Sequence, residues 1–70
     1  MDTALIAKAT LRAAQIRESS WEGQLYRIPC INAARVACEE LKVDRAMAMF
    51  IGLNLIGCWN DTLQWAKENA

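Results

Sequence analysis

The segment that most constrains how this chain can fold is an apolar stretch at residues 46–59, which reads AMAMFIGLNLIGCW. Asn54 is its one strongly polar side chain, and Asp44, Arg45, Asn60 and Asp61 flank it. As a helix the stretch would be ~21 Å long, whereas a bilayer core requires roughly 20 consecutive apolar residues. We therefore expect a buried helix in a globular protein and no membrane span.

This helix would be apolar nearly all round, which indicates burial on more than one side. The preceding helical segments carry narrow stripes rich in alanine, so they cover about half of its circumference. A second copy of the chain would cover the rest, since a two-fold homodimer is the commonest assembly of soluble chains. The alternatives are a monomer that hides the stretch and a patch kept for a different protein. The residues predicted to mediate self-association are Met47, Ala48, Met49, Phe50, Ile51, Gly52 and Leu55.

The pattern predicts an all-α fold, a small bundle of three to four helices in a single domain over residues 1–70, completed by homodimerisation. Asp2 is a candidate N-cap, and Ile6, Ala9, Ala13 and Ile16 follow at helical spacing. No run alternates at period two for long enough to predict a strand. The expected elements are a helix over 3–18, a connector over 19–28, a helix over 29–42 and a helix over 45–58. The last is either continuous with a C-terminal helix over 61–69 or separate from it.

Charge argues against nucleic acid as the main partner. Eight Lys and Arg residues balance eight Asp and Glu residues, so no net field attracts the chain to phosphate. A helix-turn-helix remains the alternative reading, because two predicted helices meet at a tight turn over 42–44. Its second helix would present Ala46, Met47, Met49 and Phe50 to the DNA groove, with only Arg45 able to read a base or grip phosphate. A small dimeric DNA-binding regulator is therefore the second hypothesis.

Catalysis and metal binding have little support. The chain has no histidine, and its cysteines at 30, 38 and 58 form no CxxC pair, so the usual zinc spacings are missing. Cys30 follows Pro29 and is a candidate nucleophile at a helix N-terminus, but it also fits the apolar stripe with Ala34, Ala37 and Leu41. We expect no enzyme, no cofactor and no metal. An odd cysteine count and a start without signal-peptide features predict a cytoplasmic protein with reduced thiols.

Aromatic and arginine side chains are enriched at protein-binding hot spots, which draws attention to the connector. The predicted partner-binding residues are Trp21, Tyr26 and Arg27, with Lys8 and Arg12 on the first helix. The sequence therefore predicts a non-enzymatic protein–protein interaction module: a small adaptor, regulator or stoichiometric inhibitor of an unidentified protein. In size alone it is similar to accessory proteins of phages and mobile elements.

Overall fold

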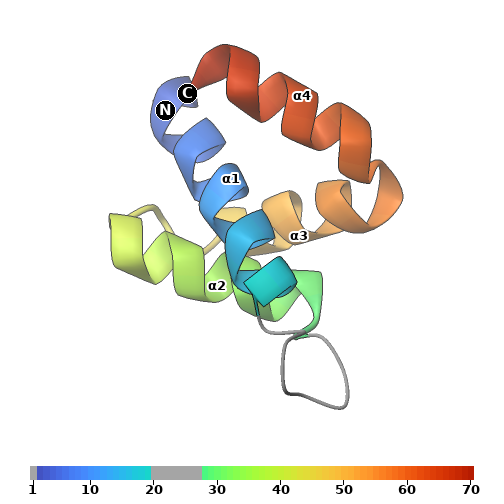
Figure 1. Ribbon diagram of the computed structural model, residues 1–70. Helices are drawn as coiled ribbons and strands as arrows, with labels where there is room; N and C mark the ends of the chain where they lie inside the picture. The colour runs from blue at the N-terminus through green and yellow to red at the C-terminus, as the bar shows by residue number, and fades with distance from the viewer. Residues whose placement is uncertain (1, 20–27) are drawn as a thin grey trace.

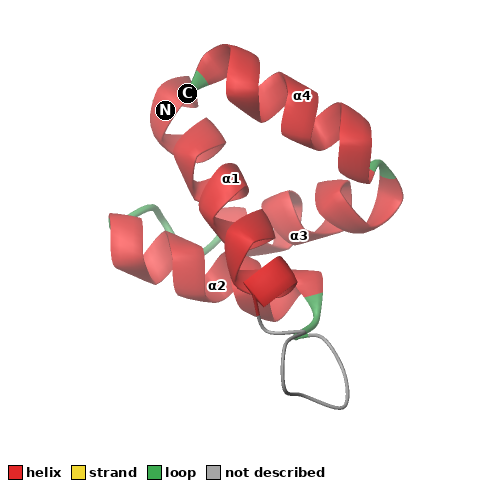
Figure 2. Ribbon diagram, in the orientation of Figure 1, coloured by secondary structure: helices red, strands yellow, loops and turns green. Residues whose placement is uncertain are grey.

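The computed structural model describes residues 2–19 and 28–70 and places four helices in them (Figure 1). These are α1 (Thr3–Ser19), α2 (Cys30–Leu41), α3 (Met47–Gly57) and α4 (Trp59–Asn69). The described part of the chain contains no strand (Figure 2). The helices pack as a compact bundle, which confirms the predicted all-α class.

α1 passes through the middle of the bundle, with α2 on one side and α4 on the other (Figure 1). α3 packs mainly on α2 and also contacts α4 and α1. Asp2 caps α1 as expected, because its Oδ1 accepts the backbone N–H groups of Ala4 and Leu5 at 3.0 and 3.3 Å. A central helix must bury two faces, so α1 buries Ala9 and Ala13 together with Ala7, Thr10 and Ala14. The second set lies outside the stripe that the sequence predicted.

The core is built mainly from small side chains. Its largest fully buried members are Ile51, Leu55, Thr10 and Cys38. Ile6, Ile16, Leu41, Trp59 and Leu63 pack around the core and are partly buried. Small residues allow the helices to approach closely. The remaining buried apolar residues are Ala7, Ala9, Ala13, Ala14, Cys30, Ala33, Ala34, Ala37, Ala48 and Ala66.

The turn between α2 and α3 is fixed by backbone geometry. Lys42 adopts the left-handed conformation with φ 57°, and the Val43 N–H donates to the Cys38 carbonyl at 2.9 Å, as in a Schellman C-cap. Asp44 then accepts the Ala46 N–H at its Oδ1, 3.0 Å away. α3 begins at Met47, two residues later than predicted, because residues 45–46 form a turn. Pro29 precedes α2 as its N-cap and is not its first residue.

α3 and α4 are separate helices, which settles the alternative that the sequence left open. Cys58 breaks the helical path with φ −144° and ψ 73°. The Asn54 carbonyl at the end of α3 accepts the Cys58 N–H at 2.8 Å and the Thr62 hydroxyl at 3.0 Å. Thr62 thus gives the Asn54 carbonyl a second hydrogen bond at the end of the helix, where carbonyl groups lack the usual partners of a continuing helix. α4 starts at Trp59, two residues earlier than predicted.

Candidate protein-binding surface

The candidate functional site is the outer face of α3, formed by Met49, Phe50, Leu53 and Ile56. These side chains are 49%, 57%, 54% and 61% exposed, and α3 contains no charged residue. At helical spacing they share the side of α3 opposite its buried residues. Large apolar side chains that are each half in water at neighbouring positions typically mark an interaction site.

The opposite side of α3 is buried by the chain itself. Ala48, Ile51, Gly52 and Leu55 lie in the core, and Met47 is partly buried against it. The cause is α2: a Cβ atom at Gly52 would lie 2.7 Å from the Ile31 Cα, so the two helices touch backbone to backbone there. The small residues at 48 and 52 therefore serve contacts within the chain. Of the seven residues predicted for self-association, Met49 and Phe50 are exposed.

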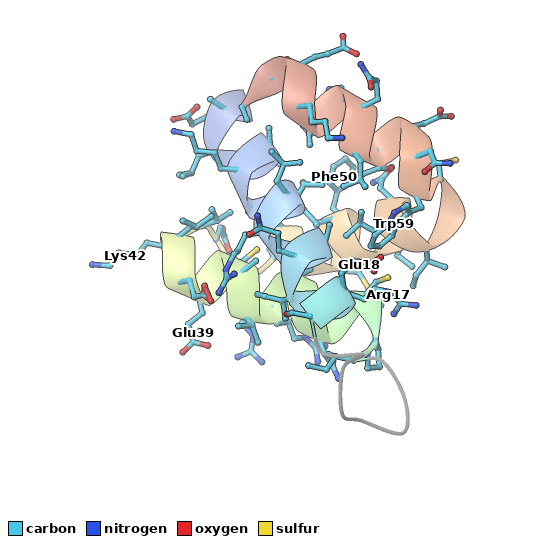
Figure 3. The ribbon with its side chains drawn as sticks, in the orientation of Figure 1. Arg17, Glu18, Glu39, Lys42, Phe50 and Trp59 are labelled. Carbon is cyan, nitrogen blue, oxygen red and sulfur yellow. The ribbon has the colours of Figure 1, made fainter. Side chains whose placement is uncertain are left out.

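A groove of about 440 Å³ borders the outer face of α3 where α1, α3 and α4 meet. Figure 3 shows Phe50 projecting from α3 toward this region. Trp65 of α4 also lines the groove and is 39% exposed. The full lining consists of Thr10, Phe50, Ile51, Asn54, Cys58, Asp61, Thr62 and Trp65.

Most polar side chains of the groove already have partners within the chain. The Thr10 hydroxyl donates to the Ile6 carbonyl at 2.8 Å, and the Asn54 amide donates to the Phe50 carbonyl at 2.8 Å. Thr62 is bonded to Asn54, as described above. The groove therefore presents mainly apolar surface, with the Asp61 carboxylate as the charged group in its lining. Such a surface fits apolar side chains of a protein better than a polar small molecule.

The predicted partner-binding residues do not form one described site. Trp21, Tyr26 and Arg27 lie outside the described residues. Lys8 is exposed on α1, whereas Arg12 is engaged within the chain: its Nε and Nη2 donate to the two carboxylate oxygens of Glu40 at 2.9 and 3.1 Å. This hydrogen-bonded ion pair raises the pKa of Arg12 and lowers that of Glu40. Arg12 thus joins α1 to α2.

The cysteines divide by environment. Cys30 and Cys38 are buried, and Cys58 is exposed at the α3–α4 junction. The burial of Cys30 agrees with its predicted place in the apolar stripe of the helix. Burial raises the pKa of the Cys38 thiol, and the negative charge of Asp44 raises it further. Among the residues that the structure describes, no cluster of His, Cys, Asp and Glu is arranged to hold a metal ion.

Arg17 connects three parts of the bundle. Its Nη1 donates to the Ile28 carbonyl at 2.9 Å, and its guanidinium lies 6.0 Å from the centre of the Trp59 ring. In Figure 3 Arg17, Glu18 and Trp59 gather where α1 ends and α4 begins. Trp59 packs on the core, whereas Trp65 reaches the groove. Glu39 and Lys42 lie at the far end of α2 (Figure 3).

The α2–turn–α3 unit has the connectivity of a helix-turn-helix, and Arg45, the residue predicted to read a base or grip phosphate, is exposed in the turn before α3. The side chains that α3 exposes are those of the outer face described above and Asn54. Base recognition requires hydrogen-bond donors and acceptors at the groove edge, and phosphate contacts require cations. Asn54, whose amide is bonded to its own helix, is the one polar side chain in α3.

Sequence reasoning did not include Leu53, Ile56 and Trp65 among the site residues. The signal for the first two was present, because Met49, Leu53 and Ile56 form one stripe of the predicted helix. The packing of α2 determines which of the two apolar sides of α3 is covered. A local sequence pattern does not predict this packing.

Comparisons with protein families, with curated proteins and with solved structures found no match to this chain. Within residues 2–19 and 28–70, no helix combines the length and apolar character needed to cross a bilayer.

Proposed function

We propose that this chain is a non-enzymatic protein–protein interaction module, a small adaptor, regulator or stoichiometric inhibitor, and that the outer face of α3 is its contact surface. The observation that carries the proposal is the exposure of four large apolar side chains on a helix without charged residues. A protein partner would remove this surface from water, and apolar burial is the main favourable contribution to protein association.

The exposed surface is large enough to matter energetically. Full burial of one such side chain is worth about 1.5–3 kcal/mol, so covering the exposed half of four of them contributes roughly 3–6 kcal/mol per copy. A partner with an equally apolar surface contributes a similar amount. Association costs about 4–15 kcal/mol in lost freedom. The balance supports a reversible complex more than a permanent one.

Self-association is part of this proposal. Two copies joined through the outer face of α3 would gain roughly 6–12 kcal/mol before the association cost is subtracted. We therefore expect a homodimer that dissociates on dilution. The homodimer predicted from the sequence used both sides of α3, whereas the present proposal uses one side.

The groove beside the outer face of α3 extends the proposed contact surface. Phe50 and Trp65 line it from two different helices, and tryptophan is among the residue types most enriched at hot spots. The Asp61 carboxylate in the lining can accept a hydrogen bond from a basic side chain of a partner. A foreign protein that presents an apolar side chain next to a lysine or arginine suits this arrangement.

A photo-crosslinking amino acid at position 53 tests the proposed function, with the same group at exposed Gln64 of α4 as the matched control. Expressed in the cells that produce the protein, the variant at 53 should form a covalent adduct with a protein, and the variant at 64 should form much less. Adduct masses distinguish a second copy from a foreign partner. Equal labelling at both positions, or no protein adduct at 53, would refute the proposal.

A further inference from the structure

The outer face of α3 carries a large side chain near one end and no side chain at the other. Met49 lies near the start of the helix, Leu53 is one turn further on, and Gly57 is one more turn away at the end. Residues four apart lie on one strip of a helix surface. The strip therefore runs from a long flexible side chain, through Leu53, to a position with no side chain.

Gly57 has no function in the packing of the described chain. Apart from its chain neighbours and the backbone of its own helix, no atom of residues 2–19 and 28–70 lies within 4 Å of the place where its Cβ would be, and Gly57 has no positive φ. Gly52 differs, because Ile31 occupies the space that a side chain would need there. Glycine is unfavourable within a helix, yet Gly57 leaves exposed space on the very strip that carries Met49 and Leu53. This space can receive a side chain from another molecule.

We propose that the occupant is a second copy of this chain, with the two α3 helices antiparallel and a two-fold axis at Leu53. Met49 of each copy then fills the space above the partner's Gly57, and Phe50 packs against the partner's Ile56. This arrangement rests on the proposed function. It specifies the partner, a second copy of the chain, and the register, meaning which residues of the two α3 helices face each other.

Complementarity of the face with itself favours this occupant. A two-fold interface uses the same patch on both subunits, so the patch must match its own reversed copy. Met49 and Gly57 are equally distant from Leu53, so reversal places a large side chain opposite the position without one at each end. Phe50 and Ile56 are also equally distant from Leu53, so reversal brings these two large side chains opposite each other. A parallel pair would instead place Met49 on Met49 and leave an open gap at Gly57.

Electrostatics agree with the same arrangement. α3 has no charged side chain, so two copies bring no like charges together. In an antiparallel pair the positive end of each helix dipole lies next to the negative end of the other.

A compensation experiment tests the register. Gly57→Leu should raise the dimer dissociation constant about tenfold or more by overpacking against Met49. Combining it with Met49→Ala in one chain should restore dimerisation, because each new leucine then faces an alanine. Sedimentation equilibrium gives the dissociation constants. Circular dichroism should show that Gly57→Leu and the double variant both keep the helical fold, since position 57 faces open space in one copy. A double variant that dimerises no better than Gly57→Leu would overturn the register.

Disulfide trapping gives a second measurement that does not depend on substitution at position 57. Facing Cα atoms on two helices with axes ~8–10 Å apart are about 3.5–5.5 Å from each other, and this overlaps the range that a disulfide spans. In a Cys58→Ser background, Leu53→Cys should form a covalent dimer under mild oxidation, whereas Gln64→Cys should not. Equal trapping at both positions, or no dimer at any concentration, would overturn the inference. Crosslinking of position 53 to a foreign protein would still support the proposed function.

Discussion

The Ile31 Cα atom lies 2.7 Å from the position that a Cβ atom would take at Gly52. Real Cβ atoms do not approach a backbone atom this closely, so the contact between α2 and α3 depends on the absence of a side chain at position 52. This contact determines which side of α3 is buried and which side faces out, and so it determines which residues form the outer face of α3.

Gly52→Ala should therefore destabilise the fold by about 1–3 kcal/mol, the usual cost of overpacking a core, because α2 has to move as a unit. In a domain of this size, a single core supplies about 3–5 kcal/mol in total. Chemical denaturation followed by circular dichroism measures the change. Gly57→Ala is the matched control in the same helix, and it should unfold at the wild-type denaturant concentration or slightly above it. Equal midpoints for the two variants would contradict the backbone contact.

Lys42→Gly should stabilise the protein by up to about 1 kcal/mol. A left-handed conformation costs an L-residue about 1–2 kcal/mol, and glycine avoids this cost. The greater freedom of glycine in the unfolded chain destabilises the protein by about 0.4–1 kcal/mol and so offsets part of the gain. Lys42→Ala is the control for loss of the charged side chain, and it should give no comparable increase. Thermal unfolding of the three proteins makes the comparison. A lower melting temperature for Lys42→Gly than for Lys42→Ala would show that φ 57° at this position carries no strain.

The Arg12–Glu40 pair predicts a dependence of stability on acid pH. Arg12 lowers the pKa of Glu40 from its ordinary value of 4.5 in the folded chain. The folded state then holds the Glu40 proton less tightly than the unfolded state, so the stabilisation is fully present above pH 4.5 and is lost as pH falls through the lowered pKa. Glu40→Gln should be less stable than the wild type at neutral pH, with a difference that shrinks below pH 4.5. Because the pair is exposed, added salt should also shrink the difference. A difference that is constant from pH 7 to strong acid would exclude the pair as its cause.

Thiol labelling of the native protein should modify one cysteine quickly. Cys58 is exposed, whereas burial protects Cys30 and Cys38 and raises the pKa of the Cys38 thiol, which reduces its reactive thiolate at neutral pH. Mass spectrometry after a short exposure should find a single adduct, and Cys58→Ser should remove it. In denaturant all three cysteines should react at similar rates. Rapid modification of Cys30 in the native protein would contradict its burial in the core.

The helical class and the cap of α1 could be predicted because they depend on local patterns. Asp2 precedes a run at helical spacing, and Lys42 to Asp44 separate two such runs. The C-cap at Lys42 shows the limit of local reasoning, since a lysine is not a typical left-handed residue and the contacts of Val43 and Cys38 hold it there.

The choice of the buried side of α3 could not be predicted. Both sides are apolar, so periodicity does not distinguish Ile51 and Leu55 from Leu53 and Ile56. The deciding contact is between residues 31 and 52, which are far apart in sequence. The second buried face of α1 was missed for a related reason. Ala7, Thr10 and Ala14 are too small or too polar to produce a strong hydrophobic signal, and burial there follows from the docking of α4.

A core built largely from alanine also shapes how the protein responds to temperature. The heat capacity change of unfolding grows with the apolar area that becomes exposed, and averages about 12–15 cal/mol/K per residue in globular proteins. An alanine side chain exposes less area on unfolding than a leucine or phenylalanine, and much of the large apolar surface of α3 is already in water in the isolated chain. The isolated chain should therefore have a smaller heat capacity change and a flatter stability curve than average. Covering the outer face of α3 in a complex would increase the heat capacity change of unfolding and make stability depend more steeply on temperature. Calorimetry alone can therefore distinguish the chain in a complex from the isolated chain.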